Sequence, residues 1–396
     1  MLNEKRITEI TEFCQSLIQN QSYSGNEQKV ANVLSEKMTE LGFDEIIKDK
    51  YGNIYGHIKG NKNGKKILFD GHMDTVITQN PELWEDNNPF SGKIKDGKLY
   101  GRGSSDMKCA LGAMVMACGY FAKDTCRDFF GDIYVAGVVH EECFEGVAAR
   151  EISKNIEPDY VVIGEASSCN LKIAQRGRAE IVVETFGKPA HSASPKEGIN
   201  AVYKMTKLID EIQKITPPHH EILGDGILEL TDIKSSPYPG ASVVPDYCKA
   251  TYDRRLLVGE TKESVLEPIV AIIKRMEEQD SQFSAKVSFA VGKETCYTGE
   301  EIQGERFFPA WLFDKKQDYI EKIYEGLLRD GLTPEITQYN FCTNGSHYAG
   351  EKGIKTIGLG PSLETLAHTD NEYVEIQELL KAAKSYYSIL TSLLTQ

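Results

Sequence analysis

Three apolar runs in the first half of the chain end in acidic or histidine residues. The runs read ILFD, IYVAGVV and YVVIG, and their length and Val, Ile and Tyr content predict strands buried on both faces, as in a parallel sheet. They lead into GHMDT at 71–75, HEE at 140–142 and EAS at 165–167. In open α/β sheets, ligands bind in the crevice beyond the carboxyl ends of such strands. We therefore expect these polar residues to lie close together.

Outside residues 178–291, helical and strand-like segments alternate along the chain. The apolar spacing predicts helices over 4–20, 27–41, 108–123 and 316–329, and strands near 52–58, 66–71, 131–139, 160–164 and 355–359. A turn and a helix N-cap are expected at Ser24-Gly25-Asn26. This alternation of strands and helices predicts an α/β fold.

Residues 178–291 follow a different pattern. Helical and strand-like segments there make up a complete small α+β unit, and the strands alternate apolar and polar residues. Such alternation is typical of an antiparallel sheet with one exposed face. We therefore expect 178–291 to be an inserted domain, with 1–177 and 292–396 forming the main domain together.

Charge and composition disfavour some partners and bear on the location of the protein. The 45 basic and 59 acidic residues give a formal net charge of −14, which disfavours nucleic acid or an anionic membrane as a partner. No apolar stretch approaches the roughly 20 residues that a membrane-spanning helix needs, and the polar first residues argue against a signal peptide. The nine cysteines are scattered without a CxxC pair, which predicts reduced thiols. These features together predict a cytoplasmic protein.

The converging polar residues suggest a metal site, because clustered carboxylates repel each other unless a cation holds them. His72 and Asp74 are two residues apart at a strand end, so both side chains leave the same face. Either both bind metal, or Asp74 accepts the second ring N–H of His72 and fixes its tautomer. Asp106 follows a glycine-containing loop at the start of the buried helix, where the helix dipole alone would also favour an acidic residue.

Further candidate residues are an acidic pair and two histidines. Glu141 and Glu142 are adjacent and should point to opposite sides of a strand. One of them could therefore bind a metal while the other takes the proton from a bound water. His191 precedes a predicted helix, and His368 follows a loop rich in Gly, Pro and Ser. Each of these positions is also typical of an exposed loop histidine.

In combination, the motifs resemble the di-zinc aminoacylase and carboxypeptidase family of metallopeptidases, which includes acetylornithine deacetylase, succinyl-diaminopimelate desuccinylase and carboxypeptidase G. The resemblance spans the chain and rests on GHMDTV, the stretch from Trp84 through PFSGKIKDGKLYGRGSSDMK, HEE, GEAS, PAHSASPKEGINAV, SVVPDYCKATYDRR and LAHTDNEYV. It implies a zinc-peptidase-like mixed sheet flanked by helices, with 178–291 as a lid and dimerisation domain. The pairing of DRRLLVGET with NGSHYAG is most similar to hydrolases linked to selenium metabolism.

The resemblance implies a centre with two zinc ions, for which cobalt or manganese could substitute. One zinc would be bound by His72 and Glu165, and the other by Glu142 and His368. Asp106 would bridge the two ions, and the peptide bond that follows it would be cis.

Catalytic and substrate-binding roles are also implied by the resemblance. Asp74 would orient His72, and Glu141 would be the general base and acid. His191 would polarise the substrate carbonyl, and Arg255 would bind a substrate carboxylate. The implied substrate pocket also includes Ser242, Asn344, Gly345, Ser346 and His347. The family often has Asn in place of Ser242 and Asp in the loop that here reads Ser346-His347-Tyr348, so these departures bear on specificity and leave the metal centre unchanged.

The implied reaction is hydrolysis of a linear amide bond by a metal-bound hydroxide. The substrate would be an N-acyl amino acid or diamino acid with a free carboxylate. A carboxypeptidase or dipeptidase that acts on short peptides is the alternative, because the same centre serves both. A non-catalytic binding module on this fold would be expected to have lost a metal ligand or the general base. Here all five implied ligands and Glu141 are present. A homodimer through the lid is expected, with His191 acting on its own chain or on its partner.

Overall fold

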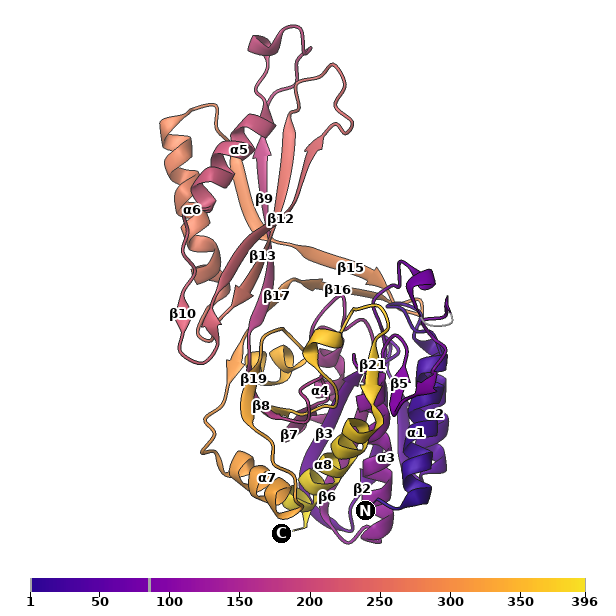
Figure 1. The fold of residues 1–396 in the computed structure, drawn as a ribbon. Helices are drawn as coiled ribbons and strands as arrows, with labels where there is room; N and C mark the ends of the chain where they lie inside the picture. The colour runs from indigo at the N-terminus through magenta and orange to yellow at the C-terminus, as the bar shows by residue number, and fades with distance from the viewer. Residues whose placement is uncertain (1, 85–86, 396) are drawn as a thin grey trace. The chain divides into compact units, whose positions relative to one another are not determined.

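The computed structural model describes residues 2–84 and 87–395, which form two compact units (Figure 1). The first unit comprises Met1–Gln175, Lys293–Gly304 and Leu312–Gln396, and the second comprises Arg176–Gly292 and Glu305–Trp311. The segment 305–311, which the sequence pattern assigned to the main domain, belongs to the second unit. It does so because β17 (Phe307–Phe308) pairs with β9 (Gly177–Phe186). Before it, β15 (Val291–Thr295) and β16 (Glu301–Glu305) form a two-stranded sheet.

The first unit contains a nine-stranded mixed sheet in the order β1-β2-β6-β3-β7-β20-β8-β18, with β19 paired to β8. Its strands are β1 (Glu45–Lys48), β2 (Ile54–Lys59), β3 (Lys62–His72), β6 (Phe130–Val138), β7 (Tyr160–Ile163), β8 (Leu171–Gln175), β18 (Trp311–Leu312), β19 (Ile336–Tyr339) and β20 (Lys355–Gly358). The four central strands β6, β3, β7 and β20 run parallel to one another, while β2 pairs with β6 and β8 pairs with β20 in the antiparallel direction. The predicted α/β fold with a mixed sheet is confirmed, and the three apolar runs of the sequence are adjacent parallel strands.

The helices of the first unit are α1 (Glu4–Gln19), α2 (Gln28–Glu40), α3 (Lys108–Asp124), α4 (Ala149–Ile156), α7 (Asp318–Arg329) and α8 (Ile376–Leu394). Nearly every residue of α3 is buried, because the helix is apolar on all sides and packs against α1, α2, α8 and β3. Gly112 permits the close approach of α1, since a Cβ atom there would lie 2.8 Å from the Cys14 sulfur. The N-cap of α2 is Glu27, one residue beyond the predicted turn at 24–26.

A small three-stranded sheet joins two loops that are far apart in the sequence. Its order is β21 (Tyr373–Glu375), β5 (Lys98–Tyr100) and β4 (Ile94–Lys95), and β21 pairs with β5 in the antiparallel direction. Tyr373 lies opposite Tyr100, so the residues that precede β21 adjoin the residues that follow β5. Short helical turns occur at Pro81–Leu83, Pro195–Glu197 and Glu364–Leu366, and a π-helix spans Ser346–Glu351.

The second unit contains an antiparallel sheet in the order β12-β13-β9-β14, with β17 paired to β9. Its remaining elements are α5 (Ala201–Ile212), α6 (Lys262–Gln279), β10 (His219–His220), β11 (Gly224–Asp225), β12 (Ile227–Ser236), β13 (Tyr247–Leu256) and β14 (Ala285–Phe289). Residues of β13 alternate in burial, as the sequence pattern predicted. The helices pack on the sheet around a core that includes Ile181, Met205, Tyr252 and Ile269.

The cysteines and the helices bear on two expectations from composition. Each of the nine cysteines, all of which lie in the described part of the chain, is a free thiol, and Cys126 is the exposed one. Across residues 2–84 and 87–395, every helix is too short or too polar to cross a membrane.

Candidate metal centre

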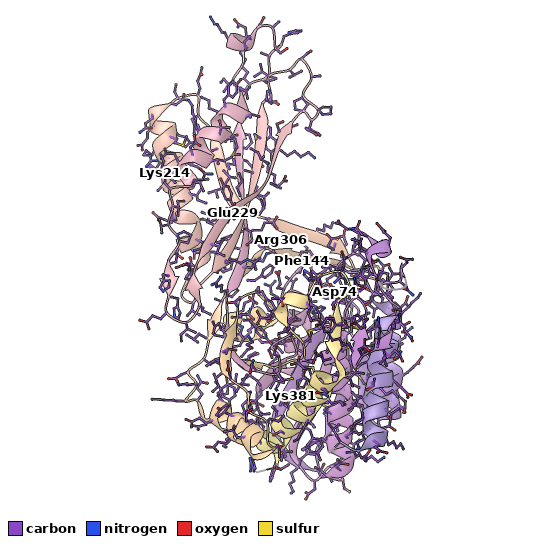
Figure 2. The ribbon with its side chains drawn as sticks, viewed as in Figure 1. Asp74, Phe144, Lys214, Glu229, Arg306 and Lys381 are labelled. Atoms are coloured by element: carbon purple, nitrogen blue, oxygen red, sulfur yellow. The ribbon has the colours of Figure 1, made fainter. Side chains whose placement is uncertain are left out.

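The polar residues that follow the central strands converge, as the sequence predicted. His72 is the last residue of β3, Glu141 and Glu142 follow β6, and Glu165 follows β7. Because β6, β3 and β7 are adjacent and parallel, their carboxyl ends meet at one edge of the sheet. In Figure 2, Asp74 is labelled at this end of the first unit.

One group of possible metal ligands surrounds His72. Its Nε2 atom lies 2.9 Å from Oδ1 of Asp106 and 3.5 Å from Oε1 of Glu165. The ring is almost fully buried, with 1% of the side chain exposed. One ligand atom each from His72, Glu141 and Glu165 lies within 4.8 Å of the others, close enough to hold one metal ion.

A second group lies on the other side of Asp106. Nε2 of His368 is 3.1 Å from Oδ2 of Asp106 and 3.0 Å from Oε2 of Glu142. The two oxygens of the Asp106 carboxylate therefore face different histidines. The Asp106–Met107 peptide bond is cis, as the resemblance implied. His368 comes from the loop before β21, and half of its side chain is exposed.

The electrostatics of the cluster fit divalent cations. Burial raises the pKa of Glu141 well above its usual range, and burial followed by the Asp106 charge does the same for the pKa of Glu165. Hydrogen bonds to Asp106 and Glu142 raise the pKa of His368 to about 10. Buried carboxylates that repel one another are the setting in which a bound cation relieves the largest cost, and this mixture of imidazole and carboxylate donors suits zinc and similar ions.

Asp74 acts differently from the predicted arrangement. Its backbone oxygen, and not its carboxylate, lies within hydrogen-bonding distance of His72 Nδ1, at 2.8 Å compared with 3.7 Å. The carboxylate accepts the backbone N–H groups of Glu141 and Glu142 at 3.0 and 3.2 Å, and the Ser24 hydroxyl at 2.7 Å. The main chain of residue 74 thus orients the histidine, and the Asp74 side chain fixes the segment that carries the two glutamates.

Glu141 lies next to the candidate metal ligands, and one of its carboxylate oxygens has no hydrogen-bond partner among the described residues. The residue is 6% exposed, and the oxygen without a partner is Oε1. A buried, unpaired carboxylate oxygen beside a group of candidate metal ligands suits either a proton acceptor or an additional ligand.

The second unit carries three of the predicted substrate residues. His191 and Val243 form an isolated β-bridge, and the backbone oxygen of Ser242 accepts the backbone N–H of Ser192, so His191 and Ser242 lie on adjoining segments. His191 is exposed, and its Nδ1 accepts the N–H of Ala193. It lies in a loop ten residues ahead of the first residue of α5.

Arg255 lies elsewhere in that unit, on β13. Its Nε donates to Oδ1 of Asp253 at 2.8 Å, and Nε of Arg178 donates to the other oxygen of Asp253 at 3.0 Å. The shared carboxylate holds two arginines that face each other across β13 and β9.

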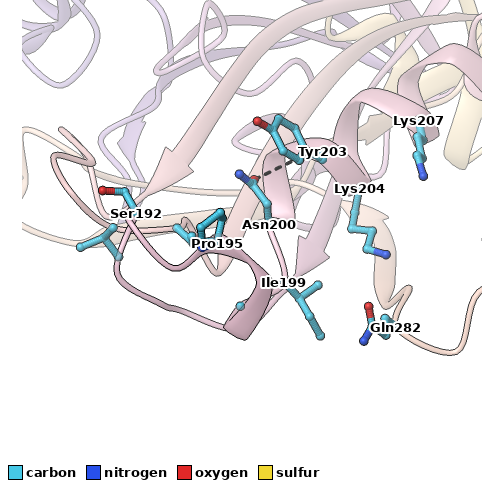
Figure 3. A pocket seen from close by; sticks show the side chains of 11 residues that line it. Ser192, Pro195, Ile199, Asn200, Tyr203, Lys204, Lys207 and Gln282 are labelled. Atoms are coloured by element: carbon cyan, nitrogen blue, oxygen red, sulfur yellow. Dashed lines mark hydrogen bonds between the residues drawn. The ribbon is translucent and has the colours of Figure 1, made fainter.

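A pocket of about 440 Å³ lies in the second unit (Figure 3). Two of its lining residues, Ser192 and Val243, directly follow His191 and Ser242 in the chain. It is lined by Ser192, Pro195, Gly198, Ile199, Asn200, Tyr203, Lys204, Lys207, Val243, Val244 and Gln282. The Nζ atom of Lys204 is bound to Asp280 at 2.6 Å. None of the lining residues is a His, Cys, Asp or Glu, so the pocket offers no typical metal ligand.

The loop 344–347, predicted to line the substrate pocket, is buried and hydrogen-bonded within the first unit. His347 is 2% exposed, and its two ring nitrogens lie 2.6 Å from Ser153 Oγ and 2.6 Å from Glu351 Oε2. Both polar atoms of the ring are therefore used inside the first unit, and binding substrate would require breaking these bonds. Gly345 and Ser346 are buried beside it. A role of His347 in substrate binding stays a prediction that these contacts do not support.

Asn344 is likewise bound to buried groups. Its side-chain nitrogen donates to Asp70 at 2.9 Å, and its side-chain oxygen accepts the N–H of Gly146 at 2.8 Å. Tyr348 donates to the other oxygen of Asp70. Burial raises the pKa of Asp70 to about 6. This network supports β3 two residues before His72.

Comparison with known protein families matches residues 68–392 to the peptidase family M20/M25/M40. The chain belongs to this family. The M20 assignment makes it a metal-dependent hydrolase of amide bonds, as the resemblance of its motifs implied.

Two relatives match over nearly their whole length. The chain is 32% identical over 388 residues to the uncharacterized protein YgeY of Escherichia coli K12, a match that covers 96% of this chain and 93% of that protein. It is 27% identical over 391 residues to succinyl-diaminopimelate desuccinylase 2 of Ruegeria sp. TM1040, covering 95% and 92%.

Solved structures of M20 peptidases share the fold. The aminopeptidase PepT of Bacillus cereus superimposes with a TM-score of 0.75 at 22% identity, covering 99% of both chains. The YXEP protein of Bacillus subtilis, described as a dinuclear metal binding peptidase, gives a TM-score of 0.72 at 14% identity, covering 98% of both chains. At these identities the likeness concerns the fold alone.

Sequence reasoning missed one buried carboxylate beside the candidate metal centre. Glu372 lies within the motif LAHTDNEYV but was given no role, although it is 0% exposed and contacts the loop that carries Asp106. Its position four residues after His368 was the available signal. Its partners could not be found from spacing, because they lie 266–270 residues away.

Proposed function

We propose that the protein is a two-metal amidohydrolase that cleaves the linear amide bond of an N-acyl amino acid or diamino acid with a free carboxylate. The observation that carries the proposal is the position of Asp106, whose two carboxylate oxygens face His72 and His368. Each histidine is accompanied by a glutamate, Glu165 or Glu142. The proposed ions are two zinc ions, with cobalt or manganese as possible substitutes.

The proposed division of labour assigns proton transfer to Glu141. Bound ions at this place supply Lewis-acid activation of a water molecule and of the scissile carbonyl. Oε1 of Glu141, which has no partner in the described chain, takes a proton from the attacking water and returns it to the leaving nitrogen. Asp74 holds the backbone N–H of residue 141 and so fixes the direction from which the carboxylate acts.

Two residues of the second unit complete the proposal. His191 polarises the substrate carbonyl, and Arg255 binds the substrate carboxylate. Arg255 suits this role because Asp253 holds its Nε, and the terminal nitrogens of a guanidinium bind carboxylates in a bidentate manner.

Replacing Arg255 with alanine is expected to raise KM about 10- to 100-fold while metal content stays unchanged. The range follows from the loss of a charged hydrogen bond to substrate. Steady-state kinetics with a carboxylate substrate and its amidated analogue provide the measurement. Arg275→Ala is the control, because Arg275 lies on α6 of the same unit with half of its side chain exposed. Equal turnover of both substrates by the unaltered protein would contradict the proposal that the substrate needs a free carboxylate.

A carboxypeptidase or dipeptidase is the second candidate, because the family to which the chain belongs is a family of peptidases. The experiment that separates the two is a hydrolysis screen of N-acyl amino acids, N-acyl diamino acids and dipeptides, with zinc, cobalt or manganese supplied. Preference for acylated substrates supports the deacylase, and preference for dipeptides supports the peptidase. A non-catalytic module would hydrolyse none of them.

We also propose that the chain forms a homodimer through its second unit. The strand β12 lies at the edge of that sheet and exposes Ile227 and Ile233, with 41% and 47% of their surfaces accessible. Unpaired edge strands favour pairing with another chain, and a second copy would satisfy the edge symmetrically.

A further inference from the structure

The carboxylate of Glu372 holds the loop that carries Asp106. Oε1 accepts the backbone N–H groups of Gly103, Ser105 and Asp106 at 3.1, 2.8 and 3.0 Å. Oε2 accepts from the Arg102 guanidinium at 2.5 Å. Three N–H groups on one oxygen define the path of the loop tightly, because moving any one of them breaks a hydrogen bond at a buried carboxylate.

The small sheet brings this carboxylate to the loop. β21 pairs with β5 so that Tyr373 lies opposite Tyr100. Beside this pair, the backbone N–H of Gly101 donates to the backbone oxygen of Glu372 at 2.9 Å. Glu372 therefore contacts the loop with both its main chain and its side chain. The same segment carries His368 four residues earlier.

The contact is buried on both sides. Glu372 is 0% exposed and Arg102 is 3% exposed. Removing one partner of a buried charge pair leaves the other uncompensated, which is costly, whereas a neutral pair of similar size is tolerated better. The contact thus links the His368 segment rigidly to the Asp106 loop.

We propose that Glu372 is a positioning residue that sets the Asp106 carboxylate between His72 and His368. The proposal rests on the metal-binding function proposed above. Glu372 itself is not placed as a ligand, and its effect passes through the backbone of residues 103–106. Residues that support metal ligands in this way typically change metal affinity about 10- to 100-fold when they are replaced.

The test replaces Glu372 with glutamine and measures cobalt binding by chelator competition and by visible absorption. Glu372→Gln retains an amide oxygen for the N–H groups but loses the charge that faces Arg102. We expect the affinity for the second cobalt equivalent to fall about 10- to 100-fold and the cobalt spectrum to change. Glu375→Gln is the matched control, because Glu375 is exposed three residues further on and should leave both unchanged.

A metal-free measurement separates the two proposals. Hydrogen exchange of residues 101–107 should accelerate in metal-free Glu372→Gln and stay unchanged in Glu375→Gln. If the unaltered protein binds no cobalt, the proposed metal function fails, whereas wild-type affinity, spectrum and exchange in Glu372→Gln would overturn the role of Glu372. Should that variant fail to fold, the double variant Arg102→Gln/Glu372→Gln replaces it, because it removes both buried charges together. Its cobalt affinity, cobalt spectrum and hydrogen exchange are then compared with those of the unaltered protein, with the same expected and contradicting results.

Discussion

Replacing Glu141 with glutamine is expected to lower kcat about 100- to 10,000-fold while the protein retains its metal. Glutamine has nearly the same shape, so packing around this buried position should persist. It cannot accept the proton from the attacking water, and that loss accounts for the expected effect. Among the described residues, Oε1 of Glu141 has no other partner, so this substitution breaks no hydrogen bond of that oxygen.

Steady-state kinetics and elemental analysis of the same preparation test this expectation. Glu151→Gln is the control, because Glu151 lies on α4 outside the cluster and pairs with Lys50 at the surface. Loss of metal from Glu141→Gln would show that Glu141 is a ligand, an arrangement that its place beside His72 and Glu165 permits. Full activity would mean that another group accepts the proton.

Replacing Asp106 with alanine is expected to abolish activity and remove both metal equivalents. This carboxylate is shared by the two ligand groups, through Oδ1 at 2.9 Å from His72 and Oδ2 at 3.1 Å from His368. Without it, the proposed ligands of each ion are one histidine and one glutamate, and the remaining carboxylates repel each other.

The measurement is metal content after dialysis of the reconstituted variant. Asp128→Ala provides the control, because Asp128 is exposed and its pair with Lys62 is a surface contact of small expected energy. Retention of two equivalents by Asp106→Ala would contradict a shared ligand, and retention of one would show that the carboxylate belongs to a single ion.

The convergence of the site could be predicted because it follows from local patterns. Apolar runs of strand length identified β3, β6 and β7, and the geometry of parallel strands places their carboxyl ends together. That rule was enough to bring His72, Glu142 and Glu165 to one edge of the sheet. Placing His368 with them required the motif resemblance, since its loop lies far from the strands in sequence.

The details that could not be predicted depend on which atom of a residue makes a contact. The sequence places Asp74 beside His72 but does not show that the backbone oxygen, and not the carboxylate, lies near the ring. His347 was expected in a substrate pocket, whereas its partner Ser153 lies 194 residues away on α4. Burial of such a pair depends on how α4 packs against the π-helix, which no local pattern records.

The central claim is that this chain hydrolyses amide bonds with two metal ions held around Asp106. The most direct measurement is the metal content of the reconstituted protein, taken together with hydrolysis of N-acyl amino acids and dipeptides before and after chelation. We predict about two equivalents per chain, loss of activity with the chelated metal and recovery when zinc, cobalt or manganese is returned. Activity that survives exhaustive removal of metal would contradict the account.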